Sequence, residues 1–318
     1  MSCIYKGSVI DTTLSQNSRG GTEQMRDRLM RNADPHLLSS VAIHFSRPRE
    51  LYQDVSNVLY CHDLPGDPEN KILQNDGWKQ FAHLVFVSAW QRDHYISMFG
   101  IPYSKCSVIP NAIELEYSYE VKQSDQIRFI YHTTPHRGLE LVYPIVDALS
   151  KKFDNIHLDV YSSFGIYGWE QRDAPYKELF DKIRNHSHMT YHGARSNNEV
   201  LSALKKSHIF LYPSIWQETS CIAMIEAIRS GCLCIHPNYG ALSETAAGAT
   251  IIYNYTENPS DHANLAYAIT NNVLTIQQTD KEFFNRITAN TSFELPRNSI
   301  NQFSASWNTL LKEITNAR

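Results

Sequence analysis

The chain has 318 residues and a formal net charge of −4. Hydrophobic residues make up 42% of it and charged residues 19%, which is ordinary for a globular protein with one large core or two smaller ones. This slightly acidic balance gives no support for general nucleic-acid binding.

Cysteine usage and hydropathy suggest a cellular compartment. The six cysteines contain no C-x-x-C pair, and no apolar run approaches the ~20 residues that span a bilayer. The first residues, MSCIYKGSVIDTT, lack the long apolar segment of a signal peptide. We therefore expect reduced cysteines and a cytoplasmic protein without a transmembrane segment, with peripheral membrane contact left open.

The sequence pattern of the N-terminal part predicts strands that alternate with helices. Gly20 and Gly21 stand at a predicted strand-to-helix turn, where backbone N–H groups can approach an anion closely; an ordinary tight turn is the alternative. Strands are expected at 41–45, 58–61 and 84–88, and a helix at 89–99. His62 directly follows the second of these strands, a position that favours a catalytic or ligand residue over a structural histidine.

A polar stretch at 114–126 is the expected linker to a second domain. That domain starts with a strand at 127–131, which leads through His132 and Thr133 to Arg137 and Gly138 and then into an amphipathic helix. Arg137 at a strand end could hold a phosphate, although a solvated position at the helix start is the alternative. A further strand is expected at 156–161, a short strand and loop at 189–195, and helices at 175–184 and 198–206.

Residues 209–244 carry the strongest pattern. A strand at 209–212 and a polar loop precede a helix at 221–229, with Ser220 as N-cap and Gly231 as C-cap. This helix is apolar on nearly every face except at Glu226, and a buried carboxylate needs a partner. A strand at 232–235 and a turn at 237–240 follow. The remaining elements are a strand at 250–253, helices at 261–275 and 281–290, and an amphipathic helix at 300–314.

Glu218 and Glu226 form an E-x7-E pair, followed by G-C-L-C-I and by a glycine before Glu244. This arrangement resembles the nucleotide-sugar site of retaining glycosyltransferases of the GT-B fold, family 4. The resemblance implies that Glu218 contacts the hydroxyls of the donor sugar and that Glu226 binds the ribose. The alternative is that Glu226 bonds to backbone or to an arginine and that Glu218 is an ordinary loop carboxylate.

Other segments are similar to the same family. V-I-P-N-A-I at 108–113 resembles the motif that closes the N-terminal domain, with Ala112 in place of glycine. Arg137 matches the second of two cations that hold the diphosphate, whereas His132 stands where the first is expected. The resemblance places Gly20 and Gly21 near the phosphates and His62 beside the sugar.

The resemblance implies further donor contacts. Thr133, Thr134 or Arg195 would compensate for the missing arginine, and the amides of the turn at Gly240 would face the diphosphate. The full set of expected donor-binding residues is Gly20, Gly21, Thr133, Thr134, Arg137, Arg195, Ser220, Cys221, Ile222, Glu226, Gly240, Ala241 and Leu242, and the expected catalytic residues are Glu218, His62 and Arg137.

The expected architecture is α/β, with two Rossmann-like doubly wound domains facing across a cleft. Residues 1–118, completed by the helix at 299–318, would form a short N-terminal acceptor domain, and residues 119–298 the nucleotide-sugar donor domain. The chain contains no D-x-D, no G-x-G-x-x-G and no zinc-ligand spacing, so neither a metal nor another cofactor is expected.

The resemblance thus implies a retaining, metal-independent hexosyltransferase of the GT-B fold. It would move a sugar from a nucleotide-diphosphate donor to a hydroxyl of a glycan, lipid or small molecule. Two alternatives stay open: a GT-B nucleotide-sugar epimerase, which needs no acceptor, and a sugar-nucleotide-binding protein without turnover.

Overall fold

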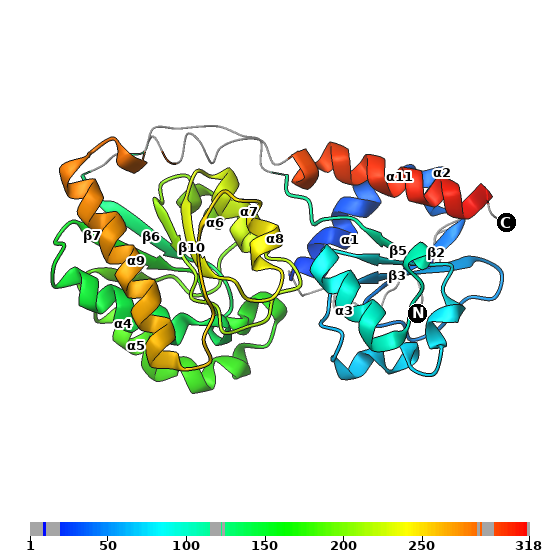
Figure 1. The fold of residues 1–318 in the computed structure, drawn as a ribbon, viewed down its shortest axis with the longest axis horizontal. Helices are drawn as coiled ribbons and strands as arrows, with labels where there is room; N and C mark the ends of the chain where they lie inside the picture. The colour runs from blue at the N-terminus through cyan, green and yellow to red at the C-terminus, as the bar shows by residue number, and fades with distance from the viewer. Residues whose placement is uncertain are drawn as a thin grey trace. The chain divides into compact units, whose positions relative to one another are not determined.

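The computed structural model describes residues 9–10, 20–114, 122, 125–284, 287 and 296–316. Contacts divide the chain into two units, one formed by Met1–Glu114 with Leu295–Arg318 and the other by Leu115–Glu294 (Figure 1). Both boundaries come a few residues earlier than those expected at 118 and 299. Most of the expected linker, half of the expected helix at 281–290 and the residues just before Gly20 lie outside the described residues.

The N-terminal unit is built on a parallel five-stranded sheet in the order β1-β2-β3-β4-β5. Every residue of β2 and nearly every residue of β3 is buried, as expected for a parallel sheet covered on both faces. The strands are β1 (Val9–Ile10), β2 (Val41–Phe45), β3 (Ser56–Cys61), β4 (His83–Phe86) and β5 (Cys106–Val108). The helices are α1 (Gly21–Asn32), α2 (Pro35–Leu38), α3 (Ala89–Phe99) and α11 (Ile300–Asn316), with short 3₁₀ turns η1 (Pro68–Leu73), η2 (Gly77–Gln80), η3 (Tyr103–Lys105) and η7 (Pro296–Asn298).

Helix α11 belongs to the N-terminal unit although it ends the chain. The backbone N–H of Asp34 donates to Asn308 Oδ1 at 2.8 Å, and Ser304 Oγ donates to a carbonyl of α1 at 2.5 Å. Trp307 is fully buried, with its ring centroid 4.9 Å from that of Tyr60 in β3. The apolar face of α11 therefore packs over α1 and α2 and reaches the sheet (Figure 1).

The C-terminal unit contains a parallel six-stranded sheet in the order β11-β10-β9-β6-β7-β8. Its strands are β6 (Ile127–Tyr131), β7 (Ile156–Val160), β8 (Met189–Tyr191), β9 (Ile209–Leu211), β10 (Leu233–Pro237) and β11 (Ile251–Tyr253). Its helices are α4 (Leu139–Ser150), α5 (Lys177–Arg184), α6 (Asn197–Leu204), α7 (Ile222–Arg229), α8 (Leu242–Ala246) and α9 (Pro259–Thr279), with 3₁₀ turns η4 (Pro135–Arg137), η5 (Phe164–Tyr167) and η6 (Glu170–Tyr176). The long helix α9 packs along α4 (Figure 1).

Two helix starts differ from the sequence-based expectation. Helix α7 begins at Ile222 with Cys221 as N-cap, so the prediction that Ser220 caps it is wrong. Helix α9 begins at Pro259, two residues before the expected start, because the side chain of Asn258 accepts from the N–H groups of Ser260 and Asp261. Asparagine as N-cap followed by proline is a strong helix start.

Candidate functional site

The candidate site lies where the loops after β6 and β9 meet. These strands are neighbours, yet the chain runs from β6 to β7 and β8 on one side and from β9 to β10 and β11 on the other. Open α/β sheets bind ligands at such a switch point, beyond the carboxyl ends of the strands. The two loops are in contact, since the N–H of Ile215 donates to the Arg137 carbonyl at 3.2 Å. A Cβ at Gly138, whose φ is +128°, would lie 2.4 Å from the Pro213 carbonyl oxygen.

Arg137 and Glu218 form an ion pair at this junction. Glu218 Oε1 accepts from Arg137 Nη1 and, at 2.5 Å, from the hydroxyl of Tyr212. Arg137 Nε donates to Thr134 Oγ1 at 3.2 Å. Glu218 is only 3% exposed, so these contacts offset the cost of burying its charge. A guanidinium carries five N–H donors, so Arg137 keeps donors for an anionic ligand.

Two buried tyrosines hold the partners of this pair in place. Burial, together with the neighbouring Glu218, raises the pKa of Tyr212 well above its usual value, so its hydroxyl stays protonated and donates. The hydroxyl of Tyr131 donates to the Thr134 carbonyl at 3.0 Å and fixes the loop after β6. Thr134 is 1% exposed, and its side chain faces Arg137.

The turn at Gly240 packs against the backbone of Glu218. Gly240 has φ +60°, and a Cβ there would lie 2.5 Å from the Glu218 carbonyl oxygen. That oxygen accepts from the N–H of Ala241 at 2.7 Å, while the N–H of Leu242 donates to Tyr239 at 3.3 Å. These two amides, expected to face a diphosphate, are therefore bonded within the protein, and the turn positions Glu218.

Glu226 lies on α7 and is 4% exposed. Its Oε1 accepts from Asn197 Nδ2 at 3.4 Å, and its Oε2 lies 4.0 Å from His132 Nε2. The same His132 nitrogen donates to the Ala223 carbonyl at 3.1 Å. Burial lowers the pKa of His132 to about 4, so the imidazole is neutral at pH 7. His132 thus places a neutral ring beside Glu226, whereas an arginine would supply a permanent charge.

The other expected donor-binding residues of the C-terminal unit include the start of α7 and the exposed Arg195. Ser220, Cys221 and Ile222 lie at the start of α7, where burial raises the pKa of the Cys221 thiol and keeps it protonated. Arg195 is exposed, with Nε 3.8 Å from Glu199 and Nη1 donating to Ala194. The expected compensating role of Arg195 at the diphosphate stays a prediction.

Gly20, Gly21 and His62 belong to the N-terminal unit. Gly20 is the N-cap of α1 in an extended conformation, and its carbonyl accepts from the N–H of Gln24 at 3.1 Å. Gly21 is the first residue of the helix, so neither glycine occupies the left-handed region here. Their expected role at the donor phosphates stays a prediction.

His62 follows β3 and is held by a strained neighbour. Its backbone N–H donates to Oγ of Ser46, a buried non-glycine residue with φ +64°. Its ring lies 4.2 Å from that of Tyr60, and burial lowers the pKa of the imidazole to about 3. His62 is therefore neutral, and its expected place beside a sugar stays a prediction.

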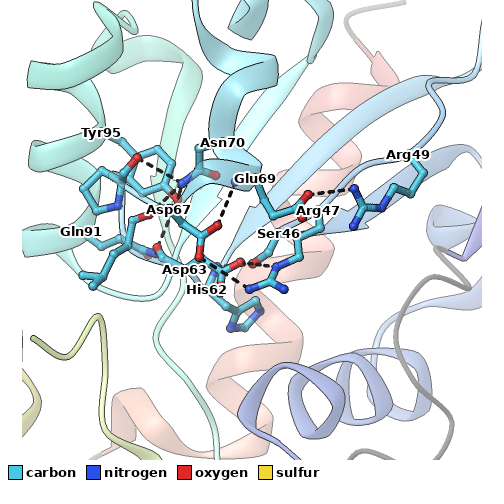
Figure 2. A network of polar contacts seen from close by, with 12 residues as sticks. Ser46, Arg47, Arg49, His62, Asp63, Asp67, Glu69, Asn70, Gln91 and Tyr95 are labelled. Atoms are coloured by element: carbon cyan, nitrogen blue, oxygen red, sulfur yellow. Dashed lines mark hydrogen bonds and ion pairs between the residues drawn. The ribbon is translucent and has the colours of Figure 1, made fainter. Parts of the chain in front are cut away.

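A polar network fixes the loop that starts at His62 (Figure 2). Arg47 Nε donates to Asp63 Oδ2 at 2.9 Å, and Arg47 Nη2 lies 3.6 Å from Asp67. The Asp63 carbonyl accepts from Gln91 Nε2 at 2.8 Å and from the hydroxyl of Tyr95 at 3.1 Å. The loop is thus tied to the loop after β2 and to α3.

Sequence reasoning missed Tyr212 and Asn197. The pattern indicates Tyr212 only as the last residue of an apolar strand; the available signal is that a buried tyrosine hydroxyl needs a partner. Asn197 follows Ser196, which forms a capping box with Glu199 and fixes the start of α6. Nothing local indicates that Asn197 reaches a carboxylate 29 positions later.

The described residues contain neither a candidate metal site nor a candidate membrane-spanning helix. In that part of the chain, no three His, Cys, Asp or Glu side chains are grouped as metal ligands would be. Its helices also include none that is both long and apolar enough to cross a bilayer.

Known proteins provide an independent comparison. The model of the family glycosyl transferases group 1 matches residues 118–282, which is about half of the chain and includes the whole junction described above. The phosphatidylinositol N-acetylglucosaminyltransferase of Homo sapiens has a subunit that is 23% identical over 205 residues, covering 63% of this chain and 39% of that protein. This chain therefore spans well under half the length of that relative.

Solved structures share the fold. A glycosyltransferase from Rickettsia africae ESF-5 has a TM-score of 0.64 at 16% identity, covering 95% of this chain and 84% of that one. The pneumococcal O-GlcNAc transferase GtfA, in complex with UDP and GlcNAc, has a TM-score of 0.63 at 11% identity, covering 82% and 53%. Anabaena Alr3699/HepE, in complex with UDP and glucose, has a TM-score of 0.60 at 14% identity, covering 81% and 72%. The predicted α/β fold class is confirmed, and with residues 118–282 matching the family model, the chain belongs to the glycosyl transferases group 1 family.

Proposed function

We propose that this protein is a retaining, metal-independent hexosyltransferase of family 4 that uses a nucleotide-diphosphate sugar. The observation that carries the proposal is the convergence of Arg137 and Glu218 at the switch point of the C-terminal sheet. The helix that follows carries the buried Glu226. A sugar diphosphate carries hydroxyl groups and a charged diphosphate. A carboxylate can accept hydrogen bonds from the hydroxyls, and a neighbouring guanidinium can bind the phosphates.

The ribose is assigned to Glu226. A carboxylate only accepts hydrogen bonds, and the two hydroxyls of a ribose are donors that would compensate for its burial. The side-chain amide of Asn197 donates to Glu226 Oε1 and helps to orient this carboxylate. The nucleoside would therefore lie near the start of α7.

The diphosphate is assigned to Arg137. Negative charge develops on the leaving group as the glycosidic bond breaks, and a preorganised guanidinium stabilises that charge. Glu218, fixed by Tyr212 and by the turn at Gly240, orients the sugar. The acceptor hydroxyl attacks from the face that the diphosphate leaves, which retains the anomeric configuration. We assign no covalent nucleophile.

UDP-sugars are the first donors to test. The matched GtfA structure holds UDP and GlcNAc, the matched HepE structure holds UDP and glucose, and the human relative belongs to an N-acetylglucosaminyltransferase. The acceptor would be a hydroxyl of a glycan, a lipid or a small molecule. We also propose a cytoplasmic protein with reduced thiols, since all the cysteines in the described residues are free and buried.

A thermal-shift panel tests the proposal. UDP, GDP, ADP, CMP and dTDP sugars are compared on wild type, Glu226→Ala and, as a control, Glu178→Ala on the exposed surface of α5. A donor at about 100 times its Kd adds about 2.7 kcal/mol of stability, which is a shift of several degrees. We expect one nucleotide class to shift wild type and the control but not Glu226→Ala. No shift with any donor would contradict the proposal.

Binding without turnover is the second candidate. The observation that favours it is the neutral His132 in the place of a family arginine, which leaves Arg137 as the cation of the loop after β6. Incubation with the bound donor and product analysis separate the cases. Transfer or slow hydrolysis supports the transferase, an epimerised donor supports an epimerase, and intact donor supports a binding protein.

A further inference from the structure

Trp216 presents an exposed indole beside the Arg137–Glu218 pair. The residue is 40% exposed, and its neighbour Ile215 is 42% exposed. The turn that carries them is fixed by Ser214, whose Oγ accepts from the Trp216 N–H at 3.2 Å and donates to the Trp216 carbonyl at 2.9 Å. An exposed tryptophan on a fixed turn loses little conformational freedom when it binds a ligand.

Ring contacts fix the indole itself. The ring of His136 meets it edge-on, with the centroids 4.9 Å apart at 83°. His136 is in turn stacked on Phe164, which follows β7, at 5.1 Å and 17°. The Arg137 guanidinium lies 5.8 Å from the indole. The aromatic platform, defined as His136, Phe164 and Trp216, therefore joins the loops after β6, β7 and β9.

The platform also contains an unsatisfied polar atom. His136 Nδ1 is buried and has no hydrogen-bond partner among the described residues. Burial and the adjacent Arg137 lower the pKa of His136 to about 4, so its ring is neutral. A hydroxyl group would suit this nitrogen whether the nitrogen donates or accepts.

We propose that Trp216 is the stacking platform for a pyranose ring whose hydroxyls reach Glu218. A pyranose has one face of C–H groups and an edge of hydroxyls, which matches an indole 5.8 Å from the guanidinium that binds the buried carboxylate of Glu218. A lone exposed tryptophan would need no explanation, but this one is held on a rigid turn at the charged pair. The inference rests on the proposed function and names a residue that would contact the sugar but not the nucleotide.

Calorimetric titration of UDP and UDP-glucose tests the inference. The proteins are wild type, Trp216→Ala, Trp216→Phe and the matched control Trp169→Ala, since Trp169 is also 40% exposed but contacts Tyr167 and Arg172. If the pyranose belongs to the donor, Trp216→Ala keeps its affinity for UDP and loses about tenfold in affinity for UDP-glucose. Trp216→Phe keeps most of the wild-type affinity for UDP-glucose, and Trp169→Ala binds both ligands with wild-type affinity.

A second titration distinguishes the acceptor from the donor. Glucose or N-acetylglucosamine is added to protein saturated with UDP, and weaker binding to Trp216→Ala in this experiment alone assigns the platform to the acceptor sugar. Equal affinities of Trp216→Ala and wild type in both titrations would overturn the inference while leaving the proposed function intact. Failure of wild type to bind UDP or any nucleotide of the panel would instead overturn both.

Discussion

At the scale of single residues, the site depends on charges that are buried with their partners. Arg137 is 21% exposed at its side chain and Glu218 is 4% exposed. Such a pair adds little net stability when intact, because desolvation opposes the attraction. Removing one partner leaves the other as an uncompensated buried charge. The pair is therefore better understood as a device that orders Glu218 for a ligand.

Replacing Arg137 tests this description. Arg137→Gln should destabilise the protein by roughly 3 kcal/mol, at the low end for a broken buried pair because Arg137 is partly solvated. The exposed pair of Arg49 and Glu69 is the control, and Arg49→Gln should cost no more than about 1 kcal/mol. Urea denaturation measures both. Equal small losses would show that the pair is solvated in solution.

Gly240 gives a second test at this scale. Gly240→Ala would introduce a Cβ 2.5 Å from the Glu218 carbonyl oxygen, so the Glu218 backbone must move. The control is Gly248→Ala, at φ +81° with no atom within 4 Å, which should cost only the strain of about 1–2 kcal/mol. Gly240→Ala should cost more and also weaken nucleotide-sugar binding, which calorimetry measures. Matched effects of the two variants would show that the close approach is unimportant.

At the scale of elements, Lys122 anchors the chain that enters the C-terminal unit. Its ammonium donates to the carbonyl of Ser207, after α6, and at 2.9 Å to that of Gly231, after α7. A third carbonyl, that of Leu204, lies at 3.4 Å. Carbonyls at the ends of helices attract cations. One side chain thus ties the ends of α6 and α7, which carry Asn197 and Glu226.

Lys122→Met should therefore destabilise the protein by about 1–3 kcal/mol, because buried carbonyls lose their donor. The exposed Lys206→Met, next to the same carbonyl cluster in sequence, is the control and should change stability little. Thermal denaturation compares them. If Lys122→Met is as stable as the control, water replaces the ammonium at these carbonyls.

At the scale of the whole molecule, buried neutral histidines make stability depend on pH. Burial lowers the pKa of His62 to about 3 and the pKa values of His132 and His236 to about 4. The unfolded chain titrates near 6.5, so it binds more protons than the folded chain between about pH 4 and 6.5. Stability must then fall as the pH is lowered through this window and level off above it.

The dependence of the unfolding free energy on pH is large enough to measure. Each such histidine adds up to about 1.4 kcal/mol per pH unit to the decrease in unfolding free energy. Urea denaturation of wild type between pH 4.5 and pH 7.5 should show this decrease, and His132→Gln should flatten it. The exposed His94→Gln controls for the loss of a histidine. A pH-independent stability of wild type would mean that these rings gain water or protons in the folded state.

The sequence by itself determines the elements of this protein and the chemistry of its best motif. Strands at 41–45 and 127–131 and a helix at 89–99 are predicted to the residue, because apolar periodicity and caps are local. Other boundaries move by one to four residues, at the ends of strands as well as of helices. Glu226 is identifiable because a carboxylate within an apolar helix needs a partner.

Only the tertiary structure decided which partners these residues have. The structure pairs Arg137 with Glu218 and Tyr212, brings Asn197 of α6 to Glu226 of α7, and packs the turn of Gly240 against Glu218. Each of these contacts joins segments that follow different strands. The packing of α11 over α1 and α2 is a contact of the same kind. Periodicity reports which face of an element is buried, whereas such contacts depend on sheet order and on how each crossover returns to the sheet. Those choices are made by the packing of the whole domain, so no local pattern encodes them.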